Sequence, residues 1–361
     1  MKHQTTRYGE IPFYKIGTFG NTADAFISKK LFLEYKTKYS FPKKGDILIS
    51  ASGTIGRAVI YDGKPAYFQD SNIVWIDNDE TLVKNDFLFY AYSNVKWNTE
   101  HTTILRLYND NFRNTLIPLP PLNEQIAIAN ILSDVDRYLY SLDALILKKE
   151  SVKKALSFEL LSQRKRLKGF NQNWQRVRLG DIGKPCMCKR VMKHQTTRYG
   201  EIPFYKIGTF GNTADAFISK KLFLEYKTKY SFPKKGDILI SASGTIGRAV
   251  IYDGKPAYFQ DSNIVWIDND ETLVKNDFLF YAYSNVKWNT EHTTILRLYN
   301  DNFRNTLIPL PPLNEQIAIA NILSDVDHEI ASLKNKKSQF ENIKKALNHD
   351  LMSAKIRVLK K

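Results

Sequence analysis

Cysteine is almost absent from this chain: Cys186 and Cys188 are the only two among its 361 residues. A single intervening residue makes a strain-free disulfide between them unfavourable, and no second pair exists to complete a zinc site. The sequence therefore gives no basis for a disulfide framework, a metal centre or a redox function. We expect two reduced thiols in a loop.

Long apolar runs are absent as well. No segment approaches the roughly 20 apolar residues of a membrane-spanning helix, and the N-terminal residues MKHQTTRYGE do not resemble a secretory signal. With 43% hydrophobic and 13% aromatic residues, the chain can still bury the cores of two domains. We therefore expect a soluble, cytoplasmic protein that has no membrane partner.

What the sequence does contain is a large internal duplication. Residues 1–136 recur letter for letter as residues 192–327, at an offset of 191. The repeat is far longer than the roughly 20–50 residues of a solenoid unit, so each copy has the size of a domain. Two identical surfaces favour a partner with two equivalent sites, and double-stranded DNA with a repeated or inverted half-site is the commonest such partner.

The net charge of +16 also suggests nucleic acid, but it is unevenly placed. Each copy holds 15 basic and 15 acidic residues, so the whole excess lies outside the duplication. Any reading of DNA by the copies must therefore depend on individual loops. We expect the basic excess, including Arg164, Lys165 and Arg166, to face the phosphate backbone or an acidic partner; a solvated helix face is the alternative.

Within a copy, the pattern up to Pro118 is typical of short strands. Residues 47–50 and 58–61 are apolar runs around a loop rich in Ser, Gly and Thr, and residues 72–77 alternate as a further strand. The aromatic segment 86–94 favours a short helix. These elements predict an α+β domain with a twisted, mainly antiparallel sheet.

At the prolines of residues 118–121 the pattern changes to that of a long helix, for which Asn123 is the expected N-cap. Its apolar positions alternate steps of four and three, as in a coiled-coil seam, and no helix breaker precedes Gly169, so it should run about 40 residues. The seam comprises Ile128, Leu132, Val135, Leu139, Leu142 and Ile146, then Val152, Leu156 and Leu160 after a shift of phase.

The second copy leads into an equivalent helix, whose sequence differs after residue 327 but keeps the apolar pattern. Its positions are Ile319, Leu323, Val326, Ile330, Leu333, Phe340, Ile343, Leu347 and Leu351. A lone helix would expose such a seam to water. We therefore expect the two helices to pack as an antiparallel coiled coil, which would relate the copies by a pseudo-twofold axis.

The string LPPLNEQIAIANILSDVD, which opens each long helix, closely resembles the conserved signature of type I restriction–modification specificity (S) subunits. Residues 169–183 (GFNQNWQRVRLGDIG) resemble the start of a target-recognition domain of that family, and the GDILIS…GTIG run is also similar. The resemblance covers essentially the whole chain. It implies two globular α+β target-recognition domains with mixed or antiparallel sheets, separated by two long helices.

The resemblance also implies a division of labour. Recognition domains at residues 1–118 and 169–309 would each read half of a split double-stranded DNA site. Spacer helices at residues 119–168 and 310–361 would bind two DNA adenine methyltransferase (M) subunits, which restriction–translocase (R) subunits then join. The chain would catalyse nothing and hold no metal or cofactor, since S-adenosylmethionine and ATP would belong to the partners. Because the domains are identical, we expect a palindromic, interrupted target.

The two copies differ in what precedes them. The segment 169–191, with Trp174 and a strand expected at residues 176–179, comes before the second copy only. The first copy begins at Met1, the equivalent of Met192. We therefore expect the first domain to lack its opening strand and to be the less stable one, either as a shortened form or as a domain completed in some other way.

Polar and basic loops are the candidate DNA contacts, because side chains on loops reach base edges and phosphates. Gln69 and Asn72 could pair bidentately with adenine, whereas Trp97 and the glycines of residues 53–56 favour a core side chain and a tight hairpin. The candidates in the first copy are Lys15, Thr18, Asn21, Lys29, Lys30, Ser52, Thr54, Arg57, Tyr67, Gln69, Asn72, Lys96 and Arg106. Their equivalents are Lys206, Thr209, Asn212, Lys220, Lys221, Ser243, Thr245, Arg248, Tyr258, Gln260, Asn263, Lys287 and Arg297.

Two other classes of function stay open on the sequence. An autonomous nuclease or methyltransferase fused to a recognition domain would need a catalytic centre, but neither a GxxxxGK[ST] loop nor an Asn-Pro-Pro-aromatic motif is present. His101 beside Glu100 or Asp110 is a conceivable nuclease centre that nothing further supports. A duplicated scaffold without a DNA role is the third class, and DNA binding that is indifferent to the basic loops would favour it.

Overall fold

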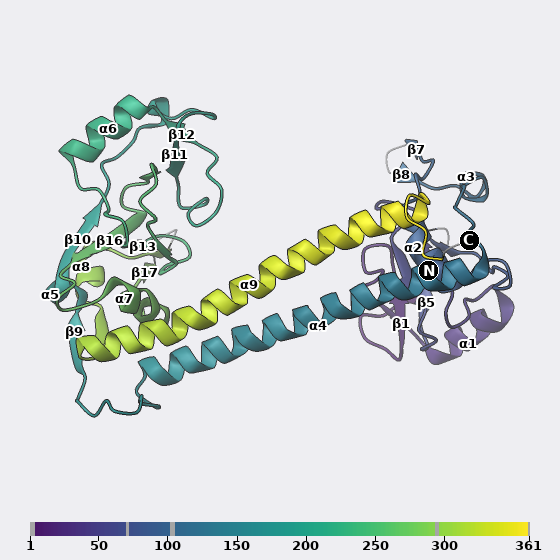
Figure 1. Cartoon of the computed structure of the whole chain (residues 1–361), viewed down its shortest axis with the longest axis horizontal. Helices are drawn as coiled ribbons and strands as arrows, with labels where there is room; N and C mark the ends of the chain where they lie inside the picture. The colour runs from purple at the N-terminus through teal and green to yellow at the C-terminus, as the bar shows by residue number, and fades with distance from the viewer. Residues whose placement is uncertain (1–3, 70–71, 102–104, 293–295, 360–361) are drawn as a thin grey trace. The chain divides into compact units, whose positions relative to one another are not determined.

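The computed structural model describes residues 4–69, 72–101, 105–292 and 296–359 (Figure 1). The chain forms two compact units: unit 1 is Met1–Ala144 with Lys334–Lys361, and unit 2 is Leu145–Leu333. Each unit contains one copy of the duplication, the beginning of the helix that follows it, and the end of the other long helix. The units therefore draw residues from both halves of the chain.

A four-stranded antiparallel sheet lies at the centre of unit 2, in the order β10-β16-β13-β14. Its strands are β10 (Gly183–Met187), β13 (Ile238–Ser241), β14 (Ala249–Ile251) and β16 (Ile264–Asn269). Ile238 and Ile240 face one apolar cluster and Leu239 faces another. Because β13 is buried on both faces, its sequence is a continuous apolar run rather than an alternating one.

The two faces of this sheet carry different layers (Figure 1). On one side lie α6 (Lys220–Lys229) and a three-stranded mixed sheet of β11 (Ile202–Tyr205), β12 (Phe217–Ile218) and β15 (Tyr258–Phe259). On the other lie α7 (Asn276–Ala282) and the start of α9. The Ser219 hydroxyl caps α6 by accepting the Leu222 N–H at 3.2 Å, a helix start that the sequence analysis did not identify.

Shorter elements complete unit 2. They are β9 (Gln175–Arg178), α5 (Leu179–Ile182), η2 (Lys193–Gln195), η3 (Tyr283–Asn285), β17 (Glu291–His292), β18 (Leu296–Arg297), α8 (Asn300–Arg304) and β19 (Leu307–Leu310). Strand β9 pairs antiparallel with β19, so the strand expected at residues 176–179 is present, one residue earlier.

Unit 1 repeats this arrangement. Its elements are β1 (Ile11–Tyr14), β2 (Phe26–Ile27), α1 (Lys29–Lys38), β3 (Ile47–Ser50), β4 (Ala58–Ile60), β5 (Tyr67–Phe68), β6 (Ile73–Trp75), α2 (Asn85–Tyr92), β7 (Glu100–His101), β8 (Leu105–Arg106) and α3 (Asn109–Arg113). Its main sheet, β4-β3-β6, has three strands, because no described part of unit 1 replaces β10. The α+β class with mixed and antiparallel sheets is confirmed.

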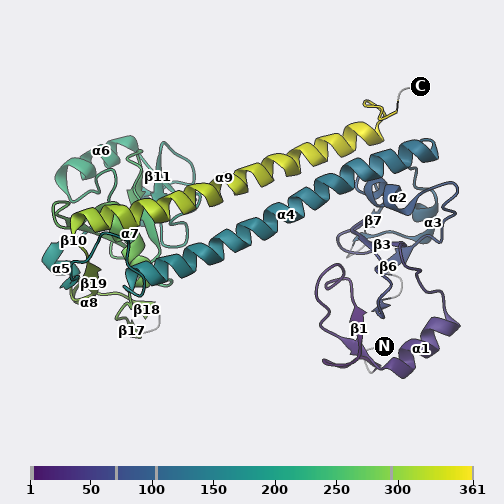
Figure 2. The same cartoon turned by 60° about the horizontal axis from the view of Figure 1, so that its bottom comes forward.

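The long helices are α4 (Leu122–Leu161) and α9 (Leu313–Met352), and each has the expected 40 residues. Within each unit they lie side by side and antiparallel (Figures 1 and 2). In unit 1, Lys344 pairs with Asp136 and Lys337 with Asp143; in unit 2, Lys149 pairs with Glu329 and Lys153 with Asp327. The predicted apolar seam is confirmed at most positions. The prediction is wrong for Val152 and Ile343, whose side chains are 46% and 51% exposed.

The expected N-cap of α4 is also wrong. The helix begins at Leu122, so Asn123 lies inside its first turn, where its side-chain oxygen accepts the Glu124 N–H at 2.9 Å. The carbonyl of Pro121 accepts the N–H groups of Glu124 and Gln125. The prolines that end the extended segment therefore also supply the first helical acceptor.

A buried glutamine fastens each long helix to its own copy. In unit 2 the Gln316 side chain is 0% exposed; its oxygen accepts the Lys275 N–H at 2.9 Å, and its nitrogen donates to the Leu273 and Pro311 carbonyls at 2.9 Å each. Gln125 makes the same three bonds in unit 1. A fully satisfied buried amide holds its partners in one geometry, because losing any bond leaves a buried polar group unpaired.

The neighbouring glutamate fastens the end of the other long helix. Glu315 is 1% exposed and accepts hydrogen bonds from Trp174 Nε1 at 2.8 Å and from the Arg166 guanidinium at 3.3 Å. In unit 1, Arg357 pairs with Glu124 at 3.3 Å. Arg357 stands 191 residues after Arg166, so the correspondence between the units continues beyond the identical sequence.

A third contact repeats in both units, where an aspartate of one long helix meets a lysine of the other beside a tyrosine. The Tyr281 hydroxyl donates to Asp327 at 2.9 Å, and Asp327 also pairs with Lys153. In unit 1 the same contacts join Tyr90, Asp136 and Lys344. Burial and the adjacent carboxylate raise the pKa of both tyrosines, so the hydroxyls stay protonated as donors.

The expectation of two loop cysteines is wrong for Cys186 and holds for Cys188, which lies outside the strands and helices. Cys186 is part of β10, and Cys188 follows it, buried among the aromatic residues of the second cluster. Burial raises the pKa of the Cys188 thiol to about 12 and also raises that of Cys186. Both are free thiols, and the raised pKa values favour the protonated form. No described helix is long and apolar enough to cross a membrane.

The glutamine anchor makes a testable prediction for stability. Gln316→Met removes three hydrogen bonds but keeps the side-chain volume, so the backbone groups of residues 273, 275 and 311 lose these bonds beside a buried methionine. We expect the free energy of unfolding of unit 2 to fall by about 3 kcal/mol in urea denaturation. The equivalent Gln125→Met should destabilise unit 1 in the same way.

The matched control is Ile317→Ala, on the same helical turn, where the side chain is 42% exposed. It should change stability by no more than about 0.5 kcal/mol. Unfolding of Gln316→Met at the same urea concentration as the unsubstituted chain would contradict the anchoring role.

Candidate nucleic-acid interface

Hydrogen bonds bring three of the candidate loops together in each copy. In unit 1 the Arg57 guanidinium donates to the Phe19 carbonyl at 3.0 Å, which joins loop 52–57 to loop 15–22. The Gln69 side-chain oxygen accepts the Ile16 N–H at 3.2 Å, which joins loop 67–72 to the same loop. Residues far apart in the sequence therefore form one contiguous surface.

A fourth segment joins this surface through Ser52. The Ser52 hydroxyl donates to the Asn72 side-chain oxygen at 2.7 Å, and the Ser52 backbone forms a bridge with Arg106 in β8. We call the surface made by residues 15–22, 52–57, 67–69, 72 and 105–106 the linked loops. In unit 2 the equivalent bonds are Arg248 to Phe210, Ile207 to Gln260 and Ser243 to Asn263, at 2.9, 3.0 and 2.7 Å.

The linked loops revise the roles of several candidates. Bidentate pairing with adenine needs both the oxygen and the nitrogen of an amide side chain. The oxygens of Gln69 and Asn72 already accept hydrogen bonds within the protein, so this arrangement does not support the expected pairing. Ser52 is buried, and Tyr258 is fully buried with its hydroxyl donating to the Lys189 carbonyl, so neither is open to DNA.

The side chains left at the surface of the linked loops are polar or basic. Asn21, Thr54 and Arg106 are exposed; Arg57 is exposed although its guanidinium is held by Phe19. Lys15 pairs with Asp24 at 2.8 Å, and the Thr18 hydroxyl accepts the Lys15 N–H, so these two stabilise their own loop. The equivalent residues of unit 2 have the same exposure and contacts.

A glycine in this surface has a structural reason. Gly56 has a φ of +80°, and a Cβ there would lie 2.1 Å from the Trp97 indole nitrogen. The indole packs with Tyr92 and Phe112 in an apolar cluster, as the sequence predicts for a core side chain. Lys96 is therefore presented at the surface beside the linked loops, because its neighbour is anchored inward.

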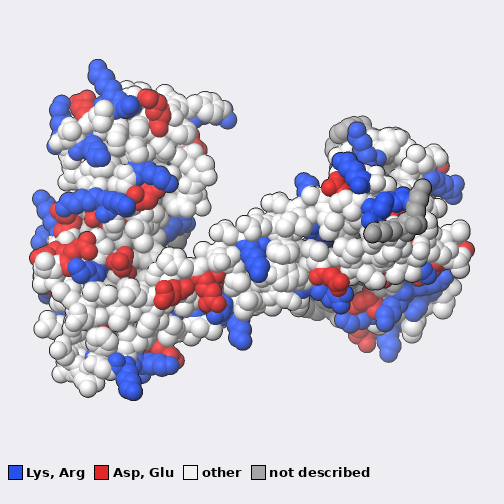
Figure 3. All heavy atoms as spheres, viewed as in Figure 1, with Lys and Arg blue, Asp and Glu red and all other residues white. Residues whose placement is uncertain are grey.

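Two candidates lie elsewhere. Lys29 and Lys30 begin α1, where both are exposed and the Lys29 N–H donates to Glu10 at 3.3 Å. No described hydrogen bond or ion pair joins them to the linked loops, and the same holds for Lys220 and Lys221 at the start of α6. On the face in Figure 3, Lys and Arg are interspersed with Asp and Glu, as the neutral composition of the copies requires.

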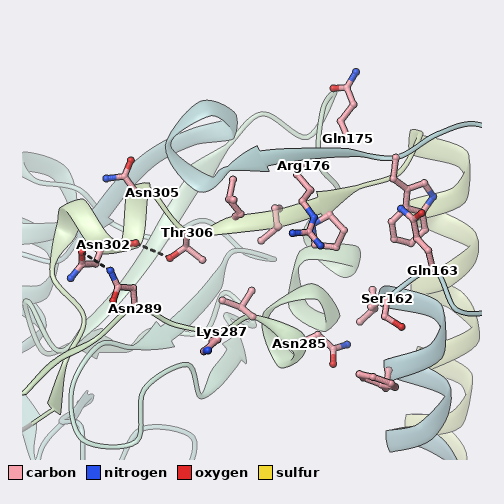
Figure 4. Close-up of a pocket in the computed structure, with 17 residues that line it drawn as sticks. Ser162, Gln163, Gln175, Arg176, Asn285, Lys287, Asn289, Asn302, Asn305 and Thr306 are labelled. Atoms are coloured by element: carbon pink, nitrogen blue, oxygen red, sulfur yellow. Dashed lines mark hydrogen bonds between the residues drawn. The ribbon is translucent and has the colours of Figure 1, made fainter.

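A polar cavity in unit 2 was missed by the sequence analysis, apart from Lys287 at its rim (Figure 4). It has a volume of about 780 Å³ and lies between the end of α4, β9, β19 and α8. Its polar lining includes Asn285, Asn289, Asn302, Asn305 and Thr306. The sequence feature that could have indicated this cavity is the high content of asparagine in residues 285–289 and 300–305, whose side-chain amides can donate and accept hydrogen bonds.

Two of the three basic residues at 164–166 already have contacts within the protein. Arg166 is committed to Glu315, and the Arg164 guanidinium lies 4.7 Å from the centre of the Phe158 ring. Lys165 and Lys168 are exposed in the segment that follows α4. A charge-reversal test of this segment must therefore spare Arg166, since its loss would unpair a buried carboxylate.

The alternative nuclease centre cannot be assembled from the described side chains. Asp110 is exposed, whereas the side chains of Glu100 and His101 lie outside the described residues. In the part of the chain that the structure describes, no group of three or more His, Cys, Asp or Glu residues is placed to hold a metal ion.

Comparisons with known proteins agree on one family. The model of the type I restriction modification DNA specificity domain matches residues 1–149 and again residues 171–342. A Haemophilus influenzae protein named as a type I restriction enzyme specificity subunit is similar, with 45% identity over 271 residues that cover 71% of this chain and 68% of that protein.

Solved structures show the same fold. The S subunit of a type I restriction–modification system from M. genitalium matches with a TM-score of 0.57 and 18% identity, over 98% of this chain and 91% of that one. A structure concerning complex assembly and conformational transition in a type I system matches with a TM-score of 0.54 and 16% identity, over 97% and 92%.

Proposed function

Since the chain belongs to the type I restriction–modification DNA specificity family, we propose that its two identical copies read two identical half-sites of one split DNA sequence. The protein confers DNA sequence specificity and is a non-catalytic subunit. The observation that carries the proposal is the recurrence of one contact set in both units: the buried glutamine, the arginine–glutamate pair and the tyrosine–aspartate–lysine group. Identical sequences held by equivalent contacts present equivalent reading surfaces.

We assign direct contact with DNA to the exposed side chains of the linked loops, with Lys96 and Lys287 beside them. The support is geometric: hydrogen bonds gather loops from distant parts of each copy into one surface that carries polar and basic groups. Polar side chains suit base edges, and arginines suit both guanine and phosphate. Asn21, Thr54 and Arg106 are exposed, as are their equivalents Asn212, Thr245 and Arg297, and this exposure supports the role.

The half-sites are inverted rather than directly repeated. Each copy leads into its own long helix, and that helix runs antiparallel to the other one in both units. A twofold rotation superimposes each of two antiparallel helices on the other. The same operation relates the two half-sites of a palindromic DNA site. The helix directions within each unit support a target made of one half-site and its inverted copy around a nonspecific spacer.

The partners that follow are a DNA adenine methyltransferase and a restriction–translocase subunit, with two methyltransferases for the two equivalent units. S-adenosylmethionine and ATP would be bound by those subunits. One of the similar solved structures concerns complex assembly in a type I system, which supports the proposal that this chain acts in a complex with partner subunits. In this proposal residues 1–118 and 169–309 are the recognition domains, and residues 119–168 and 310–361 are the spacer helices. A chromosomal DNA substrate would place the protein in the cytoplasm.

The inverted target can be tested by sequencing methylated bases in the genome of cells that co-express this chain with its methyltransferase partner. We expect a single interrupted palindrome, methylated at the same adenine of each half-site on opposite strands. Cells with the methyltransferase alone are the control and should lack the motif. Two different half-sites, or a direct repeat, would rule out equivalent reading by the two copies.

The reading surface can be tested with single substitutions in each copy. Arg106→Ala and Arg297→Ala should each weaken binding of the assembled complex to its duplex about tenfold, because a base contact contributes roughly 1–3 kcal/mol. The double variant should lose about the sum of the two free energies, since the sites are separate. Fluorescence anisotropy of a labelled duplex measures each affinity.

Lys30→Ala and Lys221→Ala are the matched controls, because they remove one exposed positive charge per copy outside the linked loops. They should change the affinity less than threefold, which is the range of a single screened surface charge. The assignment fails if the arginine variants bind like these controls, or if the two arginine variants differ from one another by more than the measurement error.

A further inference from the structure

The polar cavity of unit 2 contains two cations without an acidic partner. They are Arg176 on β9 and Lys287 in the segment after η3, and both are exposed. No aspartate or glutamate is among the described residues that line the cavity, and neither cation forms an ion pair with a described carboxylate. Positive charge that the surrounding protein leaves unpaired attracts an anionic ligand.

The local structure explains why both cations face the cavity. On β9, Val177 packs against the main apolar cluster of unit 2, and alternation along a strand places Arg176 on the opposite face. Lys287 lies between Val286 and Trp288, which both pack against the same cluster. The apolar neighbours therefore hold the backbone in place and leave the two charged side chains for the cavity.

Neutral donors of hydrogen bonds line the same cavity from other elements (Figure 4). Asn305 follows α8 and Ser162 follows α4, and neither side chain forms a hydrogen bond with a described residue. Asn302 is held in place, because its oxygen accepts from Asn289 at 3.4 Å and its nitrogen donates to Glu291 at 3.1 Å. Cations beside amide and hydroxyl donors suit a charged group with several acceptor oxygens, which is the chemistry of a phosphate.

The cavity is continuous with the linked loops of unit 2. Trp288, the neighbour of Lys287, lies against Gly247, where a Cβ would be 2.2 Å from the indole nitrogen. Glu291, which holds the asparagine of α8, lies opposite Arg297 in the β17–β18 pair. Both Gly247 and Arg297 belong to the linked loops, so the cavity and the reading surface are parts of one region.

We propose that this cavity binds a phosphate group of the DNA backbone beside the half-site that unit 2 reads. Arg176 and Lys287 supply the positive charge, and Asn305 and Ser162 donate hydrogen bonds to the phosphate oxygens. A volume of about 780 Å³ has room for the phosphate and its adjoining sugar. The inference rests on the proposed function and adds to it a contact that carries no sequence information.

The test measures the salt dependence of duplex binding by the chain assembled with its methyltransferase partner. Arg176→Gln and Lys287→Gln each remove an exposed charge, so the variants should fold normally. Each should weaken binding at least about threefold, and the double variant should lower the slope of log K against log salt concentration by about 1. The change should be equal for the target and for a duplex of unrelated sequence, because the contact is made to the backbone.

Lys221→Gln is the matched control, because it removes an exposed charge outside both the linked loops and the cavity. It should leave the slope unchanged. A scan with single neutral methylphosphonate linkages then locates the phosphate. One linkage beside a half-site should weaken binding of the unsubstituted complex at least about threefold and leave binding of the double variant unchanged, since the cations that it would meet are already removed.

The outcomes separate this inference from the proposed function. Unchanged slopes in Arg176→Gln and Lys287→Gln complexes that still prefer the target would overturn the inference alone. Absence of any sequence preference in the unsubstituted complex would overturn the proposed function, whereas the slopes with unrelated DNA would still test the cavity. Binding of inorganic phosphate or a mononucleotide that Arg176→Gln abolishes, with unchanged slopes for DNA, would assign the cavity to a small soluble ligand and overturn the inference.

Discussion

The buried glutamine at the start of each long helix is the contact on which the rest of the structure depends. Its three hydrogen bonds join the helix to the proline turn before it and to the loop before α2 or α7. These bonds fix the direction in which each long helix leaves the copy of the duplication that precedes it. The adjacent glutamate then receives an arginine that follows the other helix, so two neighbouring side chains connect both halves of the chain within one unit.

The Glu-Gln motif lies within the exact duplication, whereas the two helices differ after residues 136 and 327. The positions that contact the recognition copy must keep their hydrogen-bonding groups, because an unpaired buried partner costs about 1–3 kcal/mol. The middle of each helix only has to bury an apolar seam and match charges across it. Different side chains satisfy that requirement, as the pairs Lys337–Asp143 and Lys149–Glu329 show.

Sequence patterns predicted the elements with strong periodicity and missed those that depend on tertiary contacts. The long helices, β3 and α2 follow directly from apolar spacing and were confirmed. Helix α1 was missed because its buried side consists of little more than Phe32. The roles of Gln69 and Asn72 were misjudged for a related reason: a polar loop residue looks the same in sequence whether it faces DNA or bonds to a neighbouring loop. Identical sequences with different exposure, such as Ile76 and Ile267, cannot be distinguished from sequence patterns at all.

The central claim is that each unit presents the same reading surface to one half of a symmetric DNA site. Hydroxyl-radical footprinting of both DNA strands, with the assembled complex on its methylated target, tests this most directly. Equivalent units predict two protected patches of equal extent, which superimpose when the duplex is rotated about the centre of the spacer. Protection of one half-site alone, or two patches with the same orientation along the duplex, would contradict the account.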